Sequence, residues 1–136
     1  MEQKNAMNEI FGDVIYSYTR KQAIEDGVLV DCTKMAQEAG FKFPVAITST
    51  VWNEYIVPND ELVGCGQSYE GRLWDVLWML RYYAGLPTAT ETLKFKLYFV
   101  MIINDKPKEV LTELKAICGP GDEGEPVITI MKPEED

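Results

Sequence analysis

The sequence contains no histidine, and this absence restricts the chemistry that the chain can perform. Histidine is the side chain that ordinarily titrates near neutral pH, so Ser-His and Cys-His nucleophiles and histidine-bound metals are excluded. The three cysteines, Cys32, Cys65 and Cys118, form no C-x-x-C pair, which argues against a zinc site. No glycine-rich phosphate-binding loop is present either. We therefore expect neither a cofactor nor a metal ion.

Long apolar runs are also missing. The longest, residues 97–103, has the length of a strand and falls short of the roughly 18 apolar residues of a membrane span. The first residues lack the basic and apolar pattern of a secretory signal. An odd number of cysteines argues against a disulfide framework. Together these features predict a cytoplasmic protein with no membrane partner.

Basic residues are scarce, since 13 of them face 22 acidic residues and the net charge is −9. Such a charge disfavours nucleic acid as a partner, because phosphates repel it. Six of the acidic residues lie within 119–136, so most of the excess belongs to a turn and a tail. This clustering argues against a protein that imitates the charged surface of DNA.

The length and composition predict one folded domain. The chain has 136 residues, of which 46% are hydrophobic and 26% charged, as in ordinary globular domains. We expect a single α+β domain over residues 11–132, with flexible tails at 1–10 and 133–136. Its architecture is predicted to be an antiparallel sheet with a C-terminal three-stranded meander, one long helix packed on it, and short N-terminal helices.

The clearest element is a helix over residues 69–84. Ser68 is a typical N-cap residue, and Gly85 is typical of a helix end. On a helical wheel, one stripe that should face the sheet contains Leu73, Leu77, Leu80 and Ala84. The opposite side contains Arg72, Asp75 and Met79, which are predicted to be exposed.

The meander is predicted from three segments near the C-terminus. Residues 94–103 first alternate lysine with apolar residues and then become apolar on both faces, which is typical of a strand whose later half is central. Residues 108–118 fit a strand or a helix, and their alternation favours the strand. Residues 127–131 follow a glycine-rich turn and form the last strand. Upstream, we expect strands at 14–18, 28–31 and 45–47, helices at 20–26 and 33–40, a helical turn at 51–54, and a loop at 59–67.

Two groups of residues are candidate functional sites. Tyr16, Tyr18 and Arg20 at a helix start could stack on and hydrogen-bond a nucleotide-like ligand, with Glu54 as an acid or base. The alternative is that the tyrosines pack on the core and Arg20 is solvated.

The second group is a face of the long helix. Glu70, Trp74, Trp78 and Arg81 share this face, Trp52 could extend it, and Trp and Arg are the residue types that anchor protein interfaces. The alternative is that both tryptophans of the helix are buried under neighbouring segments. Cys65, which lies between two glycines, is predicted to be an ordinary loop cysteine.

Two stretches carry a resemblance to a known family: Gly12 to Asp31, GDVIYSYTRKQAIEDGVLVD, and Leu114 to Asp136, LKAICGPGDEGEPVITIMKPEED. They resemble an uncharacterised family of small bacterial proteins carried on plasmids and other mobile elements, a domain of unknown function. The resemblance covers about the whole chain and brings no catalytic motif with it. It implies an accessory or counter-defence role. Our leading hypothesis is therefore a non-enzymatic accessory protein that binds another protein, and the alternative is a binding protein or enzyme for nucleotide-like small molecules.

Overall fold

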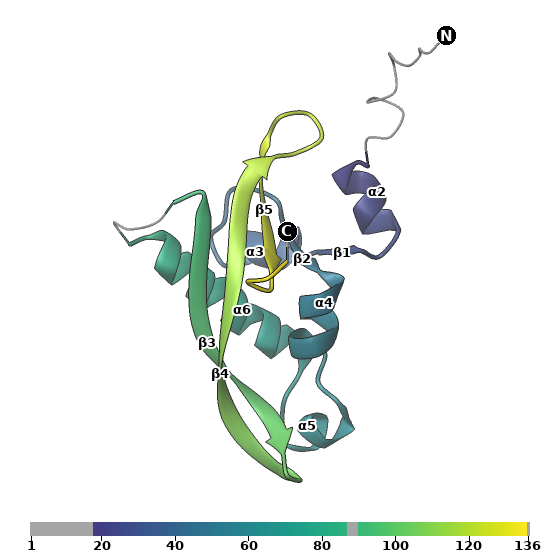
Figure 1. Ribbon diagram of the computed structural model, residues 1–136, viewed down its shortest axis with the longest axis vertical. Helices are drawn as coiled ribbons and strands as arrows, with labels where there is room; N and C mark the ends of the chain where they lie inside the picture. The colour runs from purple at the N-terminus through teal and green to yellow at the C-terminus, as the bar shows by residue number, and fades with distance from the viewer. Residues whose placement is uncertain (1–17, 87–89, 136) are drawn as a thin grey trace.

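The fold is a five-stranded sheet with one long helix packed against it (Figure 1). The computed structural model describes residues 18–86 and 90–135. The strand order is β1-β2-β5-β4-β3. The elements are α2 (Arg20–Glu25), β1 (Leu29–Asp31), α3 (Thr33–Glu38), β2 (Val45–Thr48), α4 (Ser49–Val51), the π-helix η1 (Trp52–Ile56), α5 (Asp60–Gly64), α6 (Tyr69–Ala84), β3 (Thr92–Ile103), β4 (Lys106–Pro120) and β5 (Pro126–Met131).

The predicted meander of β3, β4 and β5 is confirmed, with β4 antiparallel to both neighbours. Residues 108–118 lie within β4, so the strand interpretation of that segment is confirmed. The tight turn between β3 and β4 is made by Asn104 and Asp105, whose φ angles are 51° and 63°. Two positive φ angles define the turn that best matches the twist of a hairpin, and Asn and Asp tolerate them well.

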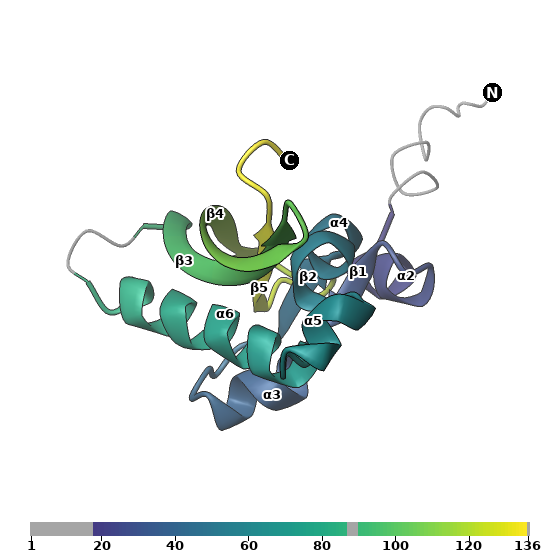
Figure 2. The same ribbon diagram turned by 90° about the horizontal axis from the view of Figure 1, so that it is seen from below.

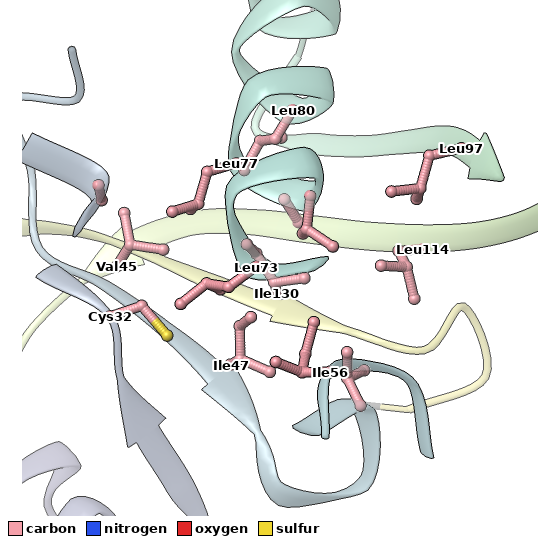
Figure 3. Close-up of a cluster of buried hydrophobic side chains, with 14 of the residues drawn as sticks. Cys32, Val45, Ile47, Ile56, Leu73, Leu77, Leu80, Leu97, Leu114 and Ile130 are labelled. Atoms are coloured by element: carbon pink, nitrogen blue, oxygen red, sulfur yellow. The ribbon is translucent and has the colours of Figure 1, made fainter. Parts of the chain in front are cut away.

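The long helix α6 occupies the predicted residues, and Ser68 caps it by accepting a hydrogen bond from the backbone N–H of Gly71. In Figure 2, β3 and β4 arch over α6, and α3 lies beside the helix on the far side from this hairpin. Leu73, Leu77 and Leu80 are buried, and Figure 3 shows them pointing toward side chains of the sheet such as Ile130. Burial of three leucines favours folding by roughly 5–8 kcal/mol.

The helical-wheel prediction was wrong at two positions. Ala84 is exposed, because α6 reaches its last turn there, whereas Arg72, which we expected to be exposed, is 3% exposed. The wheel assumed that only the sheet covers the helix. In the fold η1 also packs on α6, and η1 together with β3 covers Arg72.

Three further features differ from the predictions. The sheet is mixed rather than purely antiparallel, because β2 runs parallel to β5. Residues 60–64 form the helix α5 within the segment predicted to be a loop, with Asn59 accepting a hydrogen bond from the N–H of Leu62 as the N-cap. Finally, β3 is an edge strand, although its apolar second half predicted a central position.

The predicted strand at 14–18 lies almost entirely outside the described residues.

The two ends of the described chain are attached to the sheet. Residues 133–136 were expected to form a solvated tail, but the Glu135 carboxylate accepts hydrogen bonds from the Thr48 hydroxyl and the Lys132 N–H. At the other end, the Asp122 carboxylate accepts hydrogen bonds from the first two backbone N–H groups of α2. Within the ranges that the structure describes, no helix is long and apolar enough to cross a membrane.

Candidate functional site

An open groove lies between α6 and the edge strand β3. Its volume is about 490 Å³. The helix forms one wall, and β3 with a residue of β4 forms the other. The lining residues are Asp75, Trp78, Met79, Tyr83, Lys96, Leu97, Tyr98 and Leu111. We call this feature the α6–β3 groove.

Large apolar side chains of the α6–β3 groove remain open to solvent. Trp78 is 53% exposed, Tyr98 is 61% exposed and Leu111 is 52% exposed. Tyr98 and Leu111 are directly opposite each other on β3 and β4, so they share one face of the sheet. Exposed apolar residues scattered singly are ordinary, but these three line one hollow, and such a cluster is typical of a binding surface.

The aromatic surface continues along α6 beyond the groove. The Trp74 and Trp78 rings are tilted against each other with their centroids 6.2 Å apart. Tyr82, which is 63% exposed, makes an edge-on contact with Tyr83 at 5.8 Å. Tyrosine and tryptophan offer a large contact area with few rotatable bonds, so ordering them on binding costs little entropy.

Two charged side chains interrupt the apolar lining of the groove. Asp75 lies on the helix wall and Lys96 on the strand wall. Partial burial raises the pKa of the Asp75 carboxyl, and the nearby Arg72 guanidinium opposes this by lowering it. The groove therefore combines apolar contact area with one charged group on each wall.

The predicted interface residues divide between this groove and other places. Trp74 and Trp78 lie together as predicted, with Trp74 half-buried and Glu70 exposed. Arg81 instead donates a hydrogen bond to the carbonyl of Ala39, 2.6 Å away, just after the C-terminus of α3.

Trp52 is separate from the groove. Its ring packs on Tyr69 at 5.8 Å, and both residues line a different hollow between α3 and α6. The face predicted from the wheel is therefore reduced to the Trp74–Trp78 pair, and the fold adds residues from β3 and β4 to it.

The predicted ligand-binding group is engaged in local contacts. Tyr16 lies outside the described residues, and the Tyr18 hydroxyl donates a hydrogen bond to Asp26. The Arg20 guanidinium donates to the hydroxyl of Thr129 at 2.7 Å and to the carbonyl of Ile128 at 2.8 Å. These bonds hold α2 against β5.

Glu54 does not join that group. Its carboxylate accepts a hydrogen bond from Lys132, 3.0 Å away, and it is absent from the lining of the hollow that Arg20 borders. Two basic residues, Arg20 and Lys21, border that hollow together with four acidic side chains: Glu25, Asp31, Asp122 and Glu125. The excess of negative charge disfavours a phosphate.

Sequence reasoning missed the strand side of the groove, above all Tyr98 and Leu111. The missed signal is the apolar run at 97–103, which has apolar residues on both faces. We interpreted it as the pattern of a central strand, but the strand is at the edge of the sheet.

The cysteines do not assemble into a reactive site in the described part of the chain. Burial raises the pKa of the Cys32 thiol to about 12, so this thiol stays protonated and inert. Cys65 is exposed and Cys118 is partly buried, and all three are free. Among residues 18–86 and 90–135, no three Cys, Asp or Glu side chains are grouped as metal ligands would be.

Comparison with known proteins identifies one relationship. A family described as a family of unknown function (DUF6573) matches residues 7–136. The chain belongs to this family. No curated protein and no solved structure matches it, so DUF6573 membership is the whole of what the comparisons show.

Proposed function

We propose that this protein acts by binding another protein, and that the α6–β3 groove is its binding surface. The observation that carries the proposal is the exposure of Trp78, Tyr98 and Leu111 around one groove. Leaving apolar area in water costs roughly 25 cal/mol per Å², and that cost is recovered when a partner covers the area. Tryptophan and tyrosine are also the residues on which binding energy most often concentrates.

The proposed role is that of an accessory protein rather than an enzyme. The lack of histidine removes the usual general base, and the described residues provide no grouped metal ligands. The resemblance to proteins of plasmids and other mobile elements supports an accessory function in a bacterial host. A host defence protein is then one class of partner to test. A nucleotide-like ligand is the weaker candidate, because the Arg20 donors that would hold it already bond to β5.

Photo-crosslinking in bacterial cells tests the proposal. Benzoylphenylalanine replaces Trp78 in one variant and Phe43 in the control variant. Phe43 is also exposed and does not line the groove. We expect a discrete protein adduct from position 78 and none of the same mass from position 43. Adding Tyr98→Ala and Leu111→Ala to the first variant should remove the adduct.

Two results would reject the proposal. One is the absence of any protein adduct from position 78 when the variant is folded and expressed. The other is the same set of adducts from positions 78 and 43, which would indicate contact without a specific surface.

A further inference from the structure

The proposed function requires a partner segment that fits the groove, and the structure assigned to this segment rests on that function. We propose that the partner supplies an extended segment that pairs with the free edge of β3 as an additional strand. Its side chains on one face enter the α6–β3 groove. Acidic side chains lie beside Lys94 and Lys96, and aliphatic side chains lie beside Leu97 and Tyr98.

The first support is the backbone of β3. In the part of the chain that the structure describes, β3 pairs with β4 and with no other strand. One row of its N–H and C=O groups therefore has no strand partner. Two carbonyls of β3 accept side-chain hydrogen bonds, Thr92 from the Thr90 hydroxyl and Val100 from Arg72. The stretch open to another strand therefore lies between them, at residues 94–98. Exposed edges of this kind are templates for another strand, which gains main-chain hydrogen bonds without any change in the fold.

The second support is the pattern of side chains on β3. After Lys96, the strand is apolar on both faces up to Ile103, as a strand flanked on both sides would be. Yet Tyr98 and Ile103 are exposed at this edge. The sequence therefore suits a central strand and the fold gives it an edge position, a mismatch that an added strand removes.

The third support is the groove itself. Residues of an added strand alternate between the two faces of the sheet, so every second side chain would point toward α6. There the groove offers Trp78, Met79 and Tyr83 as apolar contacts. Main-chain pairing supplies affinity in this mode of recognition, and such pockets for alternate side chains supply specificity.

The charge of the hairpin indicates acidic residues in the partner segment. Residues 92–120 contain five lysines and three acidic residues, in a chain with 22 acidic and 13 basic residues. Lys94 and Lys96 lie on β3 itself, and β3 has no acidic residue. A second copy of the chain fits less well, since its own β3 offers only lysines, and edge lysines disfavour edge-to-edge pairing.

The test begins with a selection on the purified full chain. Phage-displayed random peptides long enough to pair with residues 94–98 are selected on the native chain and, in parallel, on Trp78→Ala. We expect the native chain to enrich peptides in which large apolar residues alternate, with Asp or Glu clustered at one end. The enrichment should be weaker on the variant.

Two matched comparisons on the best peptide identify strand addition. N-methylation of every second amide should weaken binding at least about tenfold in one register and hardly at all in the other, because only one set of amides faces β3. Lys94→Glu with Lys96→Glu should weaken binding about fivefold. Lys34→Glu with Lys42→Glu, which changes the net charge equally at sites outside the groove, should have no effect.

Any of four results would overturn the inference. Two concern the selection: enriched peptides that carry apolar residues at helical spacing, or peptides that are enriched equally on Trp78→Ala. The other two are equal binding of both N-methylated registers, and a dimer in which the second copy protects the β3 amides. If an adduct forms at position 78 in cells and one of these results is obtained, strand addition is rejected and protein binding at the groove is retained. If no adduct forms there, the proposed function fails whatever the peptides show.

Discussion

Arg72 shows how one buried residue connects separate parts of this fold. Its guanidinium donates hydrogen bonds to the carbonyls of Tyr55 and Val100, and it lies over the Phe99 ring at 5.0 Å from the ring centroid. A third hydrogen bond goes to the side chain of Gln67. A buried cation is tolerated only when its donors are used in this way. Arg72 therefore joins η1, the segment before α6, and β3.

Replacing Arg72 should destabilise the protein strongly. Arg72→Ala removes the buried guanidinium and leaves the partly buried carbonyls of Tyr55 and Val100 without their donor, so we expect a loss of about 3 kcal/mol in the free energy of unfolding. Arg81→Ala is the matched control, because Arg81 is exposed and makes one hydrogen bond to the Ala39 carbonyl, so its loss should be about 1 kcal/mol. Urea titration measures both. Equal losses in the two variants would contradict the role assigned to Arg72.

Single-residue exposure was only partly predictable from the sequence. Ser68 as an N-cap and Leu73, Leu77 and Leu80 as core residues follow from local rules that need no knowledge of the tertiary fold. The burial of Arg72 does not follow from such rules, because it depends on η1 and β3 both packing on the same side of the helix.

At the scale of elements, the short helix α2 depends on a residue about a hundred positions away. The Asp122 carboxylate accepts hydrogen bonds from the backbone N–H groups of Arg20 at 2.7 Å and Lys21 at 3.0 Å. These two N–H groups belong to the first turn of the helix, where an acceptor stabilises it. They hold the pKa of Asp122 below its ordinary value.

This contact predicts that the stability of α2 depends on pH. Because the folded-state pKa of Asp122 is lowered, its stabilisation of α2 is fully present above the ordinary carboxyl pKa of about 4 and is lost as the pH falls through the lower, folded-state value. Amide exchange of Arg20 and Lys21 should therefore be slow at neutral pH and faster in Asp122→Ala. Glu123→Ala is the control, since its carboxylate makes no contact with α2. Unchanged exchange in Asp122→Ala would contradict the contact.

The elements with strong local signals were predicted, and those that depend on long-range contacts were not. The α6 boundaries follow from a serine cap and a terminal glycine, and β4 follows from its alternation. The helix α5 was missed because its five residues sit in a polar, glycine-bearing segment that resembles a loop. Nothing local in β2 indicates that it runs parallel to β5.

At the scale of the molecule, the strand order decides where the proposed binding surface lies. With β3 at the edge, its residues 96–98 and the aromatic side of α6 border one open groove instead of being covered by another strand. The sequence indicated the aromatic pair on α6, but the strand wall of the groove required the topology. The surface is thus a property of the whole fold rather than of one helix.

The three tryptophans provide a direct test of this account, because each indole N–H gives its own NMR signal and only Trp78 lines the groove. The isotopically labelled chain is mixed with unlabelled bacterial extract, and the three indole signals are compared before and after mixing. We predict that the Trp78 signal shifts or broadens, that Trp74 follows it weakly, and that Trp52 stays unchanged. An unchanged Trp78 signal, or equal broadening of all three, would contradict the claim that the α6–β3 groove binds a partner.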